Sequence, residues 1–129
     1  MLTTATDTTF KDFDYKRPDF DAFSREFNTA LDAFEHALSA TEQSDVLRHI
    51  DDMRTDFSTM YNICMIRHTI DTRDGFYEKE NEYFDQQMPA YQGLVTAFYR
   101  RLLNAKYRQE LEAEHGKQLF DIAELRLKT

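Results

Sequence analysis

The sequence predicts an all-α protein, an antiparallel bundle of about four to six helices with an extended N-terminal arm. Apolar residues recur at spacings of three and four through most of the chain, which is the period of one helical face. Only three glycines and two prolines occur among 129 residues, so few positions would break a helix. No segment of useful length alternates apolar and polar residues, so we expect no β-strands.

Composition and charge indicate how large a core the chain can form and which kinds of binding partner are excluded. With 41% hydrophobic residues the chain is long enough for one domain with a real core, and its 11 Phe and seven Tyr are the main core material. The net charge of −8 argues against nucleic-acid binding, which needs a basic face. No apolar run approaches the roughly 18 residues of a membrane span, and no secretory signal is visible. We therefore expect a soluble, cytoplasmic protein with no membrane partner.

Residues 1–17 are expected to form a mobile tail and an extended arm, and residues 18–129 a single helical domain. The Thr-rich start has no apolar periodicity, and Phe10, Phe13 and Tyr15 follow at spacings that fit no single helical face. Pro18 suits the first turn of a helix, which we expect over 18–39. The apolar stripe of that helix consists of Phe20, Phe23, Phe27, Leu31, Phe34 and Leu38.

A second helix should follow at once. Ser39 and Glu42 have the spacing of a capping box, and the apolar pattern continues to Arg67 or beyond. Cys64, the only cysteine, lies within this pattern and is expected to be a small buried thiol. Asp71 or Thr72 is the expected N-cap of a third helix.

The pattern of the third helix is interrupted by Pro89. Because proline restricts the residue before it and has no N–H, either one long helix kinks there or a new helix begins. Gly116 is well placed to end a later helix. A last amphipathic segment over 119–127 then runs on without a stop signal, as expected of part of a longer chain.

Between the second and third helices we expect a short linker, Arg67 to Asp74, with two arginines, a histidine, two threonines and two aspartates. In the helix that follows, Glu80 shares a stripe with aromatic residues and would need a partner if it were buried. Arg67 or Arg73 is the expected partner, because a planar guanidinium satisfies a carboxylate well.

His68 lies close in sequence to Asp71 and Asp74. A histidine near carboxylates can carry a proton or bind a metal. We favour a structural hydrogen bond that pins the turn, because the surrounding residues look like helix caps.

No catalytic or metal-binding grouping is found in the sequence. An H-E-x-x-H motif, which brings two imidazoles to one zinc, is absent. A bundle with a carboxylate di-metal site needs two Glu-x-x-His pairs, and only Glu112 and His115 form one. His115 is better explained by its place in the last turn of a helix, next to the C-terminal carbonyls.

Four segments together resemble the front of a known enzyme family. They are YKRPDF at 15–20, IRHTIDTRDGFYEKENEYFD at 66–85, YQGLV at 91–95 and GKQLF at 116–120. In this combination the chain is similar to the N-terminal region of an oligoendopeptidase F type (thimet-like) zinc metallopeptidase. The resemblance implies a cytoplasmic, mostly helical enzyme that cleaves short peptides inside a deep channel, with this region as one wall.

The resemblance carries no catalytic residue onto this chain. The family's zinc ligands and general-base glutamate match no position here, so the zinc cofactor is implied only for the parent enzyme. The implied channel-lining or structural linker residues are Arg67, His68, Asp71, Arg73, Tyr77 and Glu80.

Two hypotheses for the function follow. In the first, the chain is the N-terminal helical region of a zinc metallo-oligopeptidase and is inactive alone. Its partner is then the remainder of the peptidase, and oligopeptides reach it in the complete enzyme. In the second, it is a free-standing helical module for protein or peptide interaction that pairs with a second copy of itself. Apolar surface left uncovered by the absent half would drive that homo-oligomer.

Overall fold

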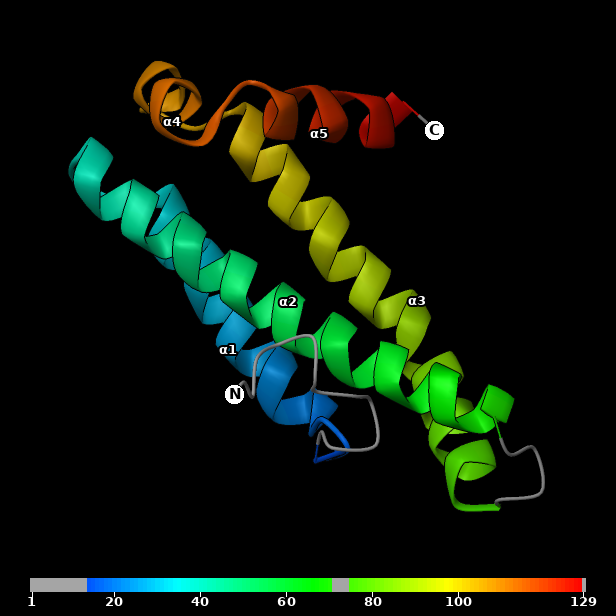
Figure 1. The fold of residues 1–129 in the computed structure, drawn as a ribbon. Coiled ribbons are helices and arrows are strands. Elements are labelled where there is room, and N and C mark those ends of the chain that lie inside the picture. The colour runs from blue at the N-terminus through cyan, green and yellow to red at the C-terminus, as the bar shows by residue number, and fades with distance from the viewer. Residues whose placement is uncertain (1–13, 71–74, 129) are drawn as a thin grey trace, which may run out of the picture.

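In a computed structural model of the protein, residues 14–70 and 75–128 are described, and within them the chain forms five α-helices. These helices are α1 (Phe20–Glu35), α2 (Ala40–Ile70), α3 (Gly75–Leu103), α4 (Arg108–His115) and α5 (Gln118–Lys128). The two helices α1 and α2 form an antiparallel hairpin, α3 runs back along α2, and α4 and α5 lie across the end where α3 finishes (Figure 1). The prediction of an all-α helical bundle is confirmed.

Helix α1 is shorter than the expected range 18–39. Asp19 is its N-cap, and the Asp19 carboxylate accepts a 3.2 Å hydrogen bond from the N–H of Ala22. Pro18 therefore precedes the helix and does not lie in its first turn. At the other end His36 is the C-cap, and its N–H still donates to the carbonyl of Asp32 at 3.1 Å.

The residues after His36 prepare the next helix. The N–H of Glu42 donates to Ser39 Oγ at 3.1 Å, and the Glu42 carboxylate accepts from the N–H of Leu38 at 3.0 Å. The expected capping pair is thus confirmed. It also explains why α1 ends early, because the residues that cap α2 are not available to extend α1.

The connection between α2 and α3 is shorter than expected, because α2 continues to Ile70. Arg67 and His68, assigned to a linker on the sequence, are instead in the last turns of α2. The expected N-caps of α3, Asp71 and Thr72, lie outside the described residues, as do Phe10 and Phe13 of the predicted arm. Of that arm, residues 14–19 are described, and they have no regular secondary structure.

Pro89 lies inside α3, which is one helix from Gly75 to Leu103, so the alternative of a new helix at Pro89 is wrong. The prediction for Gly116 is confirmed. It is the C-cap of α4 with a φ of 91°, a conformation that residues with a Cβ rarely adopt.

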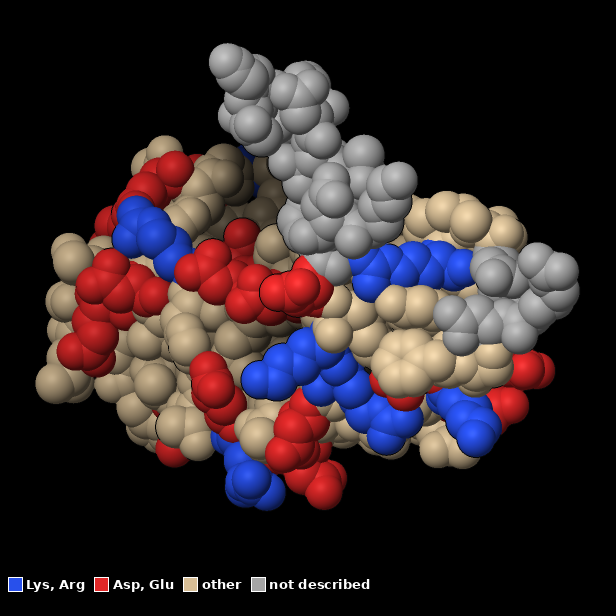
Figure 2. Space-filling model, turned by 60° about the horizontal axis from the view of Figure 1, so that its bottom comes forward, with Lys and Arg blue, Asp and Glu red and all other residues tan. Residues whose placement is uncertain are grey.

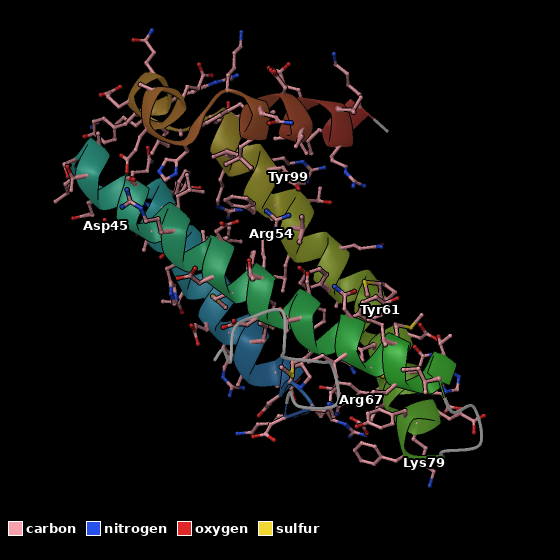
Figure 3. All side chains as sticks on the ribbon, in the orientation of Figure 1. Asp45, Arg54, Tyr61, Arg67, Lys79 and Tyr99 are labelled. Carbon is pink, nitrogen blue, oxygen red and sulfur yellow. The ribbon has the colours of Figure 1, made fainter. Side chains whose placement is uncertain are left out.

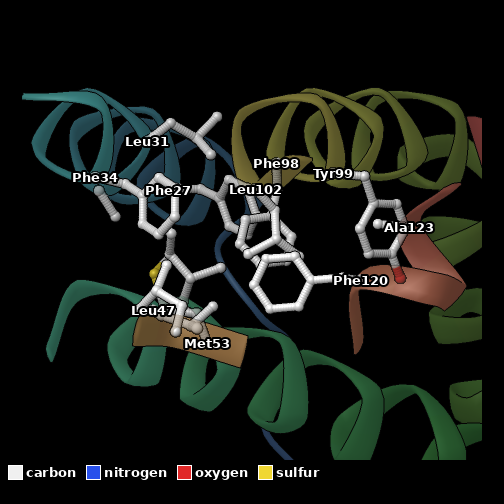
Figure 4. Packing of buried hydrophobic residues seen from close by; sticks show 13 residues of the cluster. Phe27, Leu31, Phe34, Leu47, Met53, Phe98, Tyr99, Leu102, Phe120 and Ala123 are labelled. Atoms are coloured by element: carbon white, nitrogen blue, oxygen red, sulfur yellow. The ribbon is translucent and has the colours of Figure 1, made fainter. Parts of the chain in front are cut away.

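Two aromatic-rich clusters hold the helices together. The larger cluster fills the space between α1, α2, α3 and the final helices, and Phe120 of α5 packs there with Phe98 and Leu102 (Figure 4). The smaller cluster, where α1 begins, is formed by Phe20, Phe57, Cys64 and Phe84 with several tyrosines around them. Full burial of such a side chain stabilises the fold by about 1.5–3 kcal/mol. Cys64 is fully buried, as expected, and burial raises the pKa of its thiol to about 11.

One buried amide joins the end of α1, the start of α2 and the start of α4. Gln43 of α2 is 1% exposed, and its Nε2 donates to the carbonyl of Phe34 at 2.8 Å. Its Oε1 accepts from the N–H of Tyr107 at 3.1 Å. A single side chain therefore holds the end of α1 and the start of α4 against α2, with both of its polar ends satisfied.

On the surface, acidic and basic side chains are interspersed over the face drawn in Figure 2, with no continuous basic area. Within the two described ranges, no helix has both the length and the apolar character needed to cross a membrane.

Because Pro89 is exposed and lacks an N–H, it removes one backbone hydrogen bond from the interior of α3. We expect Pro89→Ala to raise the free energy of unfolding by about 1–3 kcal/mol, measured by urea denaturation. Ala90→Gly is the matched control and should lower it by about 1 kcal/mol. A Pro89→Ala protein that is less stable than the wild type would show that α3 needs the proline's geometry.

Candidate functional site

The best-defined polar site lies where the N-terminal arm meets α3, and its centre is Glu80, which is 4% exposed. Tyr15 Oη donates to Glu80 Oε1 at 2.8 Å. Arg17 donates to both oxygens of the same carboxylate, from Nε at 3.0 Å and from Nη2 at 2.5 Å. This two-pronged pairing is the geometry in which a guanidinium binds a carboxylate most strongly.

Tyr83, one turn further along α3, completes the site. Its Oη donates to the carbonyl of Pro18 at 2.8 Å and accepts from the N–H of Phe20 at 3.1 Å. The guanidinium carbon of Arg17 lies 4.5 Å from the centre of the Tyr83 ring, close enough for a cation–π contact. We call Tyr15, Arg17, Pro18, Glu80 and Tyr83 the arm–α3 cluster.

The electrostatics of this cluster indicate a structural role. The hydrogen bond from Arg17 lowers the pKa of Glu80, and the bond from Tyr15 acts in the same direction, while burial opposes both. The pKa of Tyr15 is raised, mainly by burial and then by the hydrogen bond to Glu80. A carboxylate that stays ionised and has both oxygens occupied is a poor general acid at neutral pH.

The described partner of Glu80 is Arg17 and not Arg67. Arg17, 63 residues away in sequence, takes the place predicted for Arg67 or Arg73. Arg67 instead donates from Nη1 to Tyr77 Oη at 2.7 Å, and its guanidinium carbon is 5.7 Å from the centre of that ring. Arg73 lies outside the described residues. Of the predicted site residues, Arg67 and Tyr77 are thus brought together, and the Tyr77 ring contacts Tyr15, which binds Glu80, with ring centres 5.7 Å apart.

The two candidate histidines lie in different surroundings. His68 is half-buried in α2, and its Nδ1 is buried without a hydrogen-bond partner, so the expected pinning bond does not come from that atom. Asp71 and Asp74 are outside the described residues. His115 Nε2 lies 2.8 Å from Ser44 Oγ on α2, which joins α4 to α2. Burial lowers the pKa of His115, which favours the neutral ring.

A second polar site, which the sequence reasoning missed, lies between α2 and α3. A groove of about 500 Å³ is lined by Arg54, Ser58, Tyr91, Gln92, Val95, Thr96, Tyr99 and Arg126. We call it the α2–α3 groove. Arg54 reaches across from α2 towards Tyr99 of α3 (Figure 3), and its Nη2 donates to Tyr99 Oη at 3.0 Å.

The resemblance implies zinc only for the parent enzyme, and the described residues of this chain offer no grouping that fits it. In the part of the chain that the structure describes, no three side chains of His, Cys, Asp or Glu come together as a metal site. We therefore assign no step at a metal to the described residues.

Replacing the Glu80 carboxylate by an amide leaves one acceptor oxygen for Tyr15 and Arg17, removes the negative charge and brings an NH2 donor to face their donors. We expect Glu80→Gln to lower the free energy of unfolding by about 1–3 kcal/mol, because a buried donor left unpaired is costly. Arg17 is half-exposed and regains water, which keeps the loss below that for a fully buried ion pair. Urea denaturation measures the loss, and Glu82→Gln on the exposed face of α3 is the control. Equal stability of both variants would contradict this role of Glu80.

The lowered pKa of Glu80 also makes stability depend on pH. A carboxyl group whose pKa is lower in the folded than in the unfolded state stabilises the fold at pH values above its unfolded pKa, about 4.3. That contribution is lost as the pH falls below about 4.3 towards the folded pKa. The wild type should thus lose more stability than Glu80→Gln between about pH 5 and pH 3, as followed by melting temperature. Parallel losses in the two proteins would count against the assignment.

The described helices match a known family and several solved structures. A comparison with family models matches the peptidase M3 N-terminal domain over residues 10–129. A structure of PZ peptidase A with inhibitor 2 is 45% identical, with a TM-score of 0.89 over 94% of this chain and 22% of that chain. A candidate oligoendopeptidase F from Bacillus anthracis strain Ames is 45% identical, with a TM-score of 0.88 over 92% of this chain and 22% of its own.

A further candidate oligoendopeptidase F, from crystals grown by microfluidic seeding, is 48% identical with a TM-score of 0.89. The match includes 93% of this chain and 21% of that protein's chain. No curated protein is similar enough to the chain to count as a match. The chain thus spans about a fifth of the length of these solved proteins. Because the family match includes all five described helices, the chain belongs to the peptidase M3 N-terminal domain family.

Proposed function

We propose that this chain is the N-terminal helical region of a zinc metallo-oligopeptidase and forms part of the wall of its substrate channel. The observation that carries the proposal is its likeness to PZ peptidase A, with a TM-score of 0.89 at 45% identity over 94% of the chain. Zinc, its ligands and the general base would then belong to the remainder of the peptidase. The substrates would be short peptides, and the site of action the cytoplasm.

The surface of the chain supports a role as a wall. The described residues offer an open groove with hydroxyl, amide and guanidinium groups, but no set of metal ligands. Groups of this kind hold and orient a peptide without attacking it. The arm–α3 cluster would keep the helices fixed relative to one another, so that the wall has one shape.

The remainder of the peptidase is the proposed partner. Ile122 and Leu125 of α5 are 40% and 64% exposed, and Ile70 at the end of α2 is 77% exposed. Ile122 and Leu125 lie three residues apart on one face of α5, and adjacent exposed apolar side chains favour burial against another surface. The same side chains would be the contact in a homo-oligomer, which is the second candidate function.

A chimera tests the first proposal. The matched region of PZ peptidase A is replaced by this chain, and cleavage of an internally quenched short peptide is compared with that of the same enzyme lacking the region. We expect the chimera to be active, and the shortened enzyme to lose about 10²-fold or more in kcat/KM, because the substrate is no longer held in place.

The chain by itself is the control and should not cleave the peptide. Chelator-sensitive cleavage by the pure 129-residue chain would contradict the proposal. The proposal would also be contradicted if the shortened enzyme matched the chimera in two respects. These are the rate of cleavage of short peptides and the lack of cleavage of folded proteins.

A further inference from the structure

The α2–α3 groove adjoins a second polar surface on α2, which is lined by Asp51, Arg54, Thr55, Ser58, Thr59 and Asn62. The two share Arg54 and Ser58, so they form one continuous surface. Four of the six α2 residues carry uncharged hydroxyl or amide groups, although 31% of the chain is charged. Such groups can donate to and accept from peptide bonds without adding net charge.

Arg54 is the charged residue common to both parts of this surface, which also include Asp51 and Arg126, and its hydrogen bonds are incomplete. A guanidinium has five N–H donors, and one of those of Arg54 is used by Tyr99 Oη. Its Nε is buried and has no hydrogen-bond partner. Its guanidinium carbon is 5.5 Å and 5.3 Å from the centres of the Phe98 and Tyr99 rings.

Arg54 is half-buried and also lacks a counter-ion among the described residues. Four other arginines lie within salt-bridge distance of a carboxylate: Arg17, Arg48, Arg101 and Arg108. The chain has an excess of carboxylates, with a net charge of −8, yet none of the described ones reaches Arg54. A half-buried cation with donors left over is complementary to an anion from outside the chain.

We propose that the α2–α3 groove binds the carboxylate of an oligopeptide, with Arg54 as the anchoring group. This assignment rests on the proposed function and adds a subsite to it. Tyr91 and Val95 provide the apolar part of the groove, while Ser58, Gln92 and Thr96 can bond to the adjacent peptide group. The groove's volume of about 500 Å³ is in the range of small-ligand sites. The groove is lined by two arginines, Arg54 and Arg126, in a chain of net charge −8, and this suits a peptide carboxylate better than a polyanion.

The test measures binding to the full 129-residue chain by isothermal titration calorimetry, with three peptides. These are acetyl-trialanine with a free C-terminal carboxylate, the same peptide as a C-terminal amide, and an amide with a central glutamate. We expect the free acid to bind at least about tenfold more tightly than the trialanine amide, about 1.4 kcal/mol. Equal binding of these two peptides, or none by the free acid at millimolar concentration, overturns the proposal.

The third peptide tells apart two sources of the same chemistry. Binding of the glutamate-containing amide shows that Arg54 accepts side-chain carboxylates too, and its failure to bind limits the site to the chain end. Both outcomes support a carboxylate subsite, provided that the free acid binds.

Variants locate the site. Arg54→Gln should weaken binding of the free acid at least about tenfold, whereas Arg54→Lys keeps the charge and should lose less. Arg25→Gln, on the exposed face of α1, removes the same charge elsewhere and should leave binding unchanged. Full binding by a folded Arg54→Gln protein, checked by circular dichroism, overturns the assignment.

A second variant keeps the test valid if Arg54→Gln does not fold. Thr96→Glu leaves Arg54 in place and adds a carboxylate to the groove lining, so the groove should no longer bind the free acid. Unchanged binding by Thr96→Glu contradicts the proposal. If the chimera of PZ peptidase A is active but these peptides do not bind, only the subsite fails. If they bind and the chimera is inactive, the channel-wall function fails.

Discussion

The carboxylate of Glu80 is a charged group inside the protein, and the surrounding structure must satisfy it. An unpaired carboxylate in that position would be too costly to keep ionised. Its donors, Tyr15 and Arg17, come from a segment without secondary structure. Their hydrogen bonds to Glu80 hold that segment on α3. Because α1 begins directly after this segment, the same bonds set where α1 starts relative to α3. The fold at this end of the molecule therefore depends on a polar interaction as well as on packing.

Aromatic packing continues this arrangement along the helices. Phe57 of α2 stacks on Tyr91 of α3 with ring centres 4.2 Å apart, and Phe84 contacts Phe57 edge-on at 5.5 Å. Further along, α5 inserts Phe120 between the same helices (Figure 4). Tyr91 thus contributes both to the packing between α2 and α3 and to the lining of the groove between them. The packing of the core between α2 and α3 therefore determines where the groove lies.

Local patterns in the sequence were enough to predict the helical class and several helix ends, but not every helix boundary and not the contacts between helices. The stripe of α1, the capping pair Ser39–Glu42 and the C-cap at Gly116 involve residues within a few positions of each other, where spacing determines geometry. The pairing of Glu80 with Arg17 spans 63 residues, and no local rule selects that arginine over the nearer Arg67. Arg54 was missed for a related reason. Its lack of a counter-ion is visible only when every neighbouring carboxylate has been placed.

Arg17 and Arg54 show how the same chemical group can serve different ends in one protein. Both guanidinium groups lie beside aromatic rings of α3. Arg17 pairs with Glu80 of the same chain, so its hydrogen-bond donors contribute to the stability of the fold. The described carboxylates do not reach Arg54, and its remaining donors border an open groove, so its capacity is left for a ligand. Removing the internal partner of an arginine lowers the stability of the fold, whereas an arginine in an unoccupied site can be hydrated by water at little cost in free energy. The presence or absence of an internal carboxylate partner therefore separates structural arginines from ligand-binding ones.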